Sequence, residues 1–158
     1  MSNDQALRQH LAALLTSESA HAGFDAAVAD FPAALYGKQS TGSAHTPWQV
    51  LEHMRITQRD VLNRIGNANH RAFAFPDEYW PPAAVPRKND SWDASVAAFR
   101  ADQKALTDVI GNNKTDPFGP TRPGADGVLL DDLLMIVDHN AYHLGELILL
   151  RRLLGAWA

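Results

Sequence analysis

Two histidines near the end of the chain, His139 and His143, lie four residues apart in a segment with strong helical periodicity. Residues at this spacing project from the same face of a helix, one turn apart. Two imidazole nitrogens placed in this way can bind one metal ion at about 2.0–2.1 Å, as in the H-E-x-x-H metalloenzymes. Such a pair also occurs by chance on exposed helices, so the spacing alone does not define a metal site.

A third histidine, His53, is expected on the inward face of a different helix, between Val50 and Thr57. By itself, His53 would be explained as a hydrogen-bonded core residue. An imidazole without a partner is costly to bury, however, and three inward histidines from two helices are harder to explain separately. The residues leave two interpretations open: one shared metal site on His53, His139 and His143, or three unrelated core histidines.

The absence of cysteine limits the chemistry of any such site. It removes disulfides, thiolate nucleophiles and cysteine-containing zinc sites, so a metal here must be bound by nitrogen and oxygen. Three neutral imidazoles leave a tetrahedral metal one open position, which is typical of catalytic rather than structural sites. Such an ion would lower the pKa of a water or thiol bound to it. We expect one divalent ion, zinc or nickel, although imidazole also binds iron and copper.

The elements that must position these histidines are predicted to be helices. Apolar residues recur at helical spacing in four long segments, at about residues 4–20, 46–65, 91–111 and 128–154, and in a shorter piece over 24–35 bent at Pro32. The clearest start is Thr46-Pro47-Trp48-Gln49, with a threonine N-cap and proline at the first helical position. We therefore expect an all-α four-helix bundle that forms a single domain over residues 1–158.

The last predicted helix is the most apolar. Two apolar stripes run along it, one of Leu130, Leu134, Val137, Ala141, Leu144 and Ile148 and the other of Ile136, His139, Leu147, Leu150 and Leu154. A helix that is apolar on most sides is usually buried, so we expect it at the centre of the bundle. Two long loops are predicted, at residues 67–89 and 112–127, and the first is rich in aromatic residues and proline. Loops of this length are usually functional or cover a site.

Composition and charge indicate a globular protein without a nucleic-acid or membrane partner. The chain has 158 residues, of which 46% are hydrophobic and 20% charged, and its formal net charge is -4. This balance disfavours non-specific binding to nucleic acid or to anionic membranes. Charged residues interrupt the apolar segment 128–154, which argues against a membrane span. The polar N-terminus lacks a secretory leader pattern, so we expect a soluble, cytoplasmic protein.

Two segments resemble the DinB-like, damage-inducible superfamily of bacterial metalloproteins: residues 46–53 (TPWQVLEH) and 138–146 (DHNAYHLGE). The ending, residues 150–157 (LRRLLGAW), is also similar. The resemblance covers nearly the whole chain and implies a four-helix bundle, often a homodimer, with one divalent metal ion on His53, His139 and His143. Many relatives continue H-x3-H with Gly-Gln, whereas this chain has Gly145-Glu146. The family's substrates are therefore not carried over.

Some characterised members of the superfamily are thiol-dependent transferases or isomerases. The resemblance thus implies a metal-dependent enzyme that uses a low-molecular-weight thiol as cofactor and acts on a small-molecule substrate. Because the chain lacks cysteine, the sulfur nucleophile must be imported. Trp48, Tyr79, Trp80 and Trp92 could wall the pocket, or they could serve ordinary packing.

Two other functions remain open. Metal-dependent hydrolysis would need a general base near the open position, and Glu146 is the nearest candidate. Glu146 could instead accept a hydrogen bond behind a ligand. A non-enzymatic, metal-stabilised stress-response module that captures a small molecule is the other possibility. His21 and His45 are expected at the edge of the pocket, and no residue is assigned a catalytic role.

Overall fold

The computed structural model describes residues 1–16, 21–88 and 91–157, and the protein is all-helical over these ranges, with one isolated β-bridge between Pro120 and Val128. The prediction of an all-α fold is confirmed. The helices are α1 (Asn3–Leu15), α2 (Phe24–Val28), α3 (Pro47–Arg64), α4 (Ser91–Gly111) and α5 (Leu129–Leu153), with a 3-10 turn at Ala33–Leu35.

The first two predicted segments differ from the structure at their ends. Helix α1 ends at Leu15 with Thr16 as its C-cap, and the remainder of the predicted helix, residues 17–20, lies outside the described residues. The predicted piece over 24–35 is two short elements, because α2 already ends at Val28. Asp30 has a positive φ of 50° and Pro32 has no backbone N–H to donate, so a continuous helix cannot pass through this stretch.

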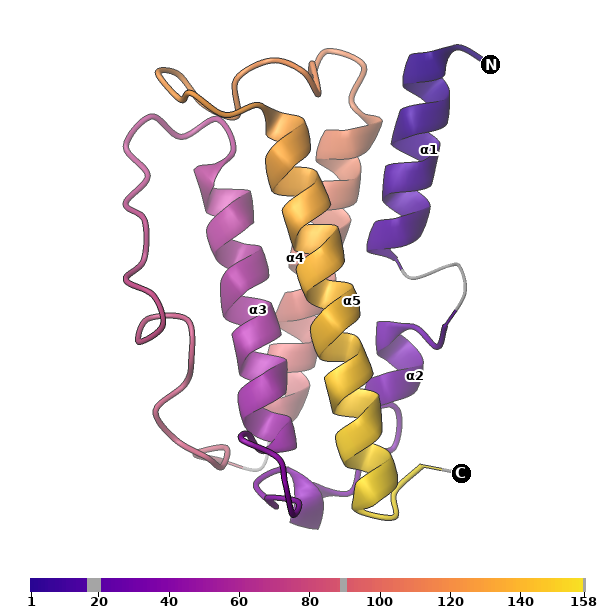
Figure 1. Ribbon diagram of the computed structural model, residues 1–158, viewed down its shortest axis with the longest axis vertical. Coiled ribbons are helices and arrows are strands. Elements are labelled where there is room, and N and C mark those ends of the chain that lie inside the picture. The colour runs from indigo at the N-terminus through magenta and orange to yellow at the C-terminus, as the bar shows by residue number, and fades with distance from the viewer. Residues whose placement is uncertain (17–20, 89–90, 158) are drawn as a thin grey trace.

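Four helices form the bundle, and each of α1 and α3 packs on both α4 and α5. In Figure 1, α3 and α4 run in the same direction, whereas α5 runs back between them and α1. A parallel pair of helices cannot be joined by a tight turn. The connection after α3 must therefore return along the whole helix, about 27 Å for 18 residues. This return path explains the first long loop, which descends along the outer side of α3 in Figure 1.

The core divides into two apolar clusters stacked along the bundle. Helix α4 contributes to both through the stripe predicted from its period: Trp92, Val96, Phe99, Leu106 and Ile110 are all buried. One cluster surrounds the aromatic end of this stripe and includes α2, and the other surrounds the aliphatic end and includes α1. The histidines of interest therefore sit on helices that are packed tightly at both ends.

The expectation that α5 is buried on most sides is wrong. Leu134, Tyr142 and Leu149 are 47%, 73% and 53% exposed. The reason is geometric: α5 packs against α1, α2 and α3, and no further helix in the described part of the chain covers its outer side, which faces the viewer in Figure 1. None of the helices in the described part of the chain, α5 included, is both long and apolar enough to cross a membrane.

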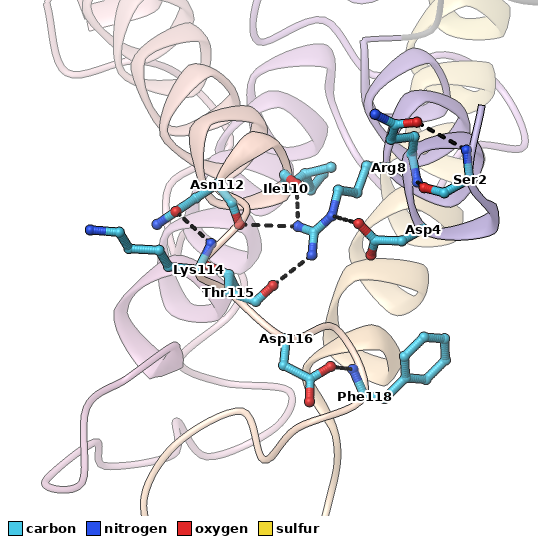
Figure 2. Close-up of polar contacts among 10 residues, drawn as sticks. Ser2, Asp4, Arg8, Ile110, Asn112, Lys114, Thr115, Asp116 and Phe118 are labelled. Atoms are coloured by element: carbon cyan, nitrogen blue, oxygen red, sulfur yellow. Dashed lines mark hydrogen bonds and ion pairs between the residues drawn. The ribbon is translucent and has the colours of Figure 1, made fainter.

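The buried side chain of Arg8 holds α1 against the C-terminal end of α4 (Figure 2). The guanidinium of Arg8 donates hydrogen bonds to the carbonyl oxygens of Ile110 (2.7 Å), Asn112 (3.2 Å) and Thr115 (2.6 Å). Asp4, one turn earlier on α1, accepts from its Nε at 2.8 Å. The carbonyls at a helix C-terminus lack intrahelical partners and carry negative partial charge, so a cation there stabilises both helices.

Candidate metal centre

Local sequence places the three histidines on well-formed helices. Helix α3 begins with a complete capping box: the Thr46 hydroxyl accepts from the Gln49 backbone, and the Gln49 side chain accepts from the Thr46 backbone. His53 follows about two turns later, on the buried face of α3. His139 and His143 lie one turn apart in the middle of α5. Both helices extend well beyond these positions, which makes the histidine backbones rigid.

The structure brings the three predicted histidines together. One ring nitrogen from each of His53, His139 and His143 lies within 4.8 Å of the other two. The closest pair is Nε2 of His53 and Nε2 of His139, 3.0 Å apart. His53 and His143 are buried and His139 is half-buried. Helices α3 and α5, whose relative position could not be predicted from residue spacing, therefore lie against each other at these three histidines.

Two of the rings use their outer nitrogen for a strong hydrogen bond. Nδ1 of His53 donates to the Tyr79 carbonyl oxygen at 2.9 Å, and Nδ1 of His143 donates to Oε2 of Glu146 at 2.8 Å. Carbonyl and ionised carboxylate oxygens only accept, so in both rings the proton is on Nδ1. Nε2 is then left with its lone pair. Metal-binding histidines are usually held in this way, by an acceptor behind the ring.

The third ring is oriented by a chain of buried amides. Gln58, fully buried, donates to the carbonyl oxygen of Phe99 and accepts from Nδ2 of Asn140, both at 2.8 Å. The amide of Asn140 must therefore present Oδ1 on its other side, 3.4 Å from Nδ1 of His139. The shorter contact of His139 is the one between its Nε2 and Nε2 of His53, so in the metal-free protein Nε2 of His139 donates to His53.

This arrangement fits a metal ion. Nε2 of His53 and Nε2 of His139 face each other across 3.0 Å, and a metal ion bound there would replace the proton that these two nitrogens share in the metal-free protein. Two nitrogens bound to one tetrahedral ion at 2.0–2.1 Å would be about 3.3 Å apart, close to the separation found. The donor set thus suits a divalent ion that accepts imidazole.

The protonation states also suit metal binding. Burial, and next the neighbouring His143 and His53, lowers the pKa of His139 from 6.5 to about 4. Burial also lowers the pKa of His53, although the hydrogen bond to Tyr79 opposes the shift. Both rings are neutral at pH 7, as metal ligands must be. The hydrogen bond from His143 lowers the pKa of Glu146, which keeps this acceptor ionised.

The three histidines line a cavity of about 470 Å³ between α3, α5 and the long loop. The other lining residues are Thr57, Asp60, Val61, Arg64, Phe73, Phe75, Tyr79, Trp80 and Met135. Of the four aromatic residues considered from sequence, Tyr79 and Trp80 line it. Trp48 lines a separate hollow that contains none of the three histidines, and Trp92 is 2% exposed in the core. For these two, ordinary packing is the correct interpretation.

Trp80 closes one side of the site by stacking between two imidazoles. Its ring lies 3.8 Å from that of His53 and 3.7 Å from that of His45, nearly parallel to both. Nδ1 of His45 is in turn 3.8 Å from Oε1 of Glu146. His45 therefore does lie at the edge of the site. His21 does not reach it and instead contacts its neighbouring backbone on an exposed turn.

A buried carboxylate holds the loop against α3. Oδ2 of Asp60 accepts from the Tyr79 hydroxyl at 2.8 Å, and Oδ1 accepts from Nε2 of His70 at 2.7 Å. Burial and the bond to Asp60 raise the pKa of Tyr79 to about 12, so its hydroxyl stays a donor. Tyr79 thus links Asp60 to His53 through its hydroxyl and its carbonyl. Sequence reasoning missed this contact, because no local pattern relates a loop residue to α3.

Comparison with known proteins identifies one family. A sequence profile of the DinB superfamily matches residues 16–147. No curated protein and no solved structure is significantly similar to the chain. The family assignment therefore rests on this match, which spans α2 to α5 and includes all three histidines.

Proposed function

The chain belongs to the DinB superfamily, and on that premise we propose that it holds one divalent metal ion on His53, His139 and His143 and is a metal-dependent enzyme that uses a low-molecular-weight thiol. One observation carries the proposal. One ring nitrogen of each of the three imidazoles lies within 4.8 Å of the other two, and Nδ1 of His53 and of His143 is directed at an outer acceptor, so that the inner nitrogens can face one ion. Zinc and nickel are the ions we expect.

Each group around the site has a definable task. A divalent ion bound by three neutral imidazoles would supply positive charge and an open coordination place, which lowers the pKa of a thiol or water bound there. Tyr79 and Glu146 hold two of the imidazoles in orientation through hydrogen bonds to Nδ1. Trp80 covers His53 and limits the access of water to it. Because the chain has no cysteine, the thiol must be a separate molecule.

The positions of the carboxylates favour thiol transfer over hydrolysis. Glu146 is engaged by His143 and is not among the residues that line the cavity. Asp60 does line the cavity, but both its oxygens accept hydrogen bonds from the loop. Among the described residues, no lining carboxylate is free to act as the general base that a hydrolase would need.

Metal binding is tested by elemental analysis of the purified protein and of a His143→Ala variant. We expect about one equivalent of metal per chain in the first and a strong loss in the second, because two imidazoles hold the ion far less tightly than three. His10→Ala, which removes an exposed histidine of α1, is the matched control and should retain the metal. Equal metal content in the parent and His143→Ala proteins would refute the assignment.

Activity is tested with the metal-loaded protein and two kinds of substrate. Turnover of an aryl halide only when a low-molecular-weight thiol is added supports transfer. Turnover of an activated ester without thiol, lost in His143→Ala, would replace the proposal with hydrolysis. If neither substrate reacts although metal is bound and a small molecule is captured tightly, the result points to a metal-stabilised binding module.

A further inference from the structure

The wall of the cavity is apolar on three sides. The loop contributes Phe73 and Phe75, α3 contributes Val61, and α5 contributes Met135. Phe75 and Met135 are 79% and 40% exposed, so they face solvent or the cavity mouth rather than the core. Exposed apolar side chains gathered at a cavity usually mark a binding surface, since each costs free energy in water.

The charges in the same wall are already compensated. Asp60 accepts from Tyr79 and His70. Arg64 pairs with Asp132 at 2.8 Å. A charged group on a ligand would therefore lose its hydration in the cavity without gaining a partner of opposite charge, which is unfavourable. Two polar atoms of the lining residues, Nε of Arg64 and Oγ1 of Thr57, are buried without a hydrogen-bond partner among the described residues, and apart from these and the three histidines the wall offers a ligand mainly apolar contact.

We infer that the cavity receives the body of an uncharged, apolar substrate, alkyl or aryl, whose reactive group reaches the three histidines. Only one part of this inference, the position of the reactive group of the substrate, rests on the proposed metal site. It assigns the cavity to the electrophilic substrate rather than to a hydrophilic thiol, because a polyhydroxylated or highly charged cofactor would find few partners there. The thiol then approaches the site from its solvent side.

Straight-chain alkyl hydroxamates, from acetyl to octanoyl, test the inference by calorimetric titration of the zinc-loaded protein. The hydroxamate binds the ion in every member, so the chain length reports the cavity alone. We expect the affinity to rise about fourfold for each methylene until the cavity is filled. A suberic acid monohydroxamate, whose chain ends in a carboxylate, should bind at least tenfold more weakly than the octanoyl compound. No dependence on length, or equal binding of these two compounds, would overturn the inference.

Substitutions in the cavity wall test whether its apolar residues are responsible for the binding of the alkyl chain. Phe75→Ser and Met135→Ser should each weaken octanoyl hydroxamate severalfold and leave acetohydroxamate unchanged. Phe118→Ser and Leu14→Ser are matched controls, because these residues are similarly exposed but do not line the cavity. Loss of binding in the controls as well, or in neither set, would contradict the assignment of this wall.

These experiments distinguish a protein that binds no metal from a cavity that does not bind apolar ligands. If the protein holds no zinc, acetohydroxamate does not bind and elemental analysis shows no metal. The cavity is then tested separately by titrating the metal-free protein with 1-hexanol and ethanol and following tryptophan fluorescence, since Trp80 lines the cavity. Saturable quenching by hexanol, reduced in Phe75→Ser and absent with ethanol, supports the apolar site. A response equal for both alcohols would reject it.

Discussion

Each converging histidine is held by a neighbour of a different chemical type. His53 donates to a backbone carbonyl, His143 to a carboxylate, and His139 faces the amide of Asn140. The carbonyl of Tyr79 depends on the loop, whereas Glu146 lies on the same helix as the histidine that it contacts. Substitutions behind the rings should therefore alter metal affinity without removing a ligand.

Glu146→Ala is expected to weaken metal binding roughly 10- to 100-fold, the usual effect of removing an acceptor behind a metal-binding histidine. Glu146→Gln should have a smaller effect, since the amide oxygen can still accept from Nδ1 of His143. Competition with a chromophoric chelator measures both affinities. Asp138→Ala is the control, because Asp138 is an exposed acid on the same helix beside His139. A similar loss of affinity in Asp138→Ala would show that the effect is only one of overall charge.

The depressed pKa of His139 predicts how the metal-free protein responds to acid. Its pKa is about 4 in the folded protein and 6.5 without the fold, so between these values the unfolded chain binds the extra proton. The free energy of unfolding is then fully retained above pH 6.5 and falls as the pH drops toward 4, by at most about 3 kcal/mol for this residue. Urea unfolding with a chelator, at several pH values, measures the slope. His139→Gln should flatten it, and an unchanged slope would contradict the prediction.

At the scale of helices and loops, two connections decide how the site is built. The connection after α3 must return along the bundle because α3 and α4 run in parallel, and on its way it supplies Tyr79 and Trp80 to the cavity (Figure 1). Helix α1 contributes no residue to the cavity. It is held to the C-terminal end of α4 by Arg8 (Figure 2).

Arg8→Ala should lower the free energy of unfolding by about 2–3 kcal/mol, because it removes charged hydrogen bonds to three carbonyl oxygens. Urea denaturation checks the value. The control is Arg100→Ala on α4, whose ion pair with Asp25 is exposed and should contribute at most about 1 kcal/mol. The metal content of the folded Arg8→Ala protein should remain that of the parent. Loss of metal would show that α1 supports the site as well as the fold.

At the scale of the whole molecule, the outer face of α5 is apolar and has no covering element among the described residues. Most of its exposed positions are paired about the point between Ala141 and Tyr142, whereas Met135 and Leu153 have no exposed counterpart. An antiparallel second copy would place Leu134 opposite the other chain's Leu149. The acidic N-terminal end of α5 would likewise meet the basic C-terminal end of the other copy. A self-complementary face of this kind suits a two-fold dimer.

We therefore propose that this face forms the homodimer expected from the family. Analytical ultracentrifugation should give a dimer for the parent protein and a monomer for Leu149→Glu, which places a charge in the apolar contact. Val85→Glu is the control, because Val85 is equally exposed, 53%, but lies in the long loop. A monomeric parent protein would refute the proposal, and a dimeric Leu149→Glu would place the interface elsewhere.

Much of the fold and part of the site followed from local sequence alone. The 3.6-residue period located the long helices, and the Thr46 capping box marked the start of α3 within one residue. The same period put His139 and His143 on one face. These features depend only on interactions between residues a few positions apart, so a linear pattern contains them.

The tertiary structure decided what lies between segments distant in the chain. His53 meets His139 across 86 positions, the loop is tied to Asp60 through Tyr79, and α5 keeps an open face although apolar residues occur on most of its sides. The interpretation of Trp92 was settled in the same way. Such contacts arise from the combined packing of all the helices and from the relative direction of α3 and α4. Neither is encoded in any single segment, because the free energy that selects them is shared over the whole core.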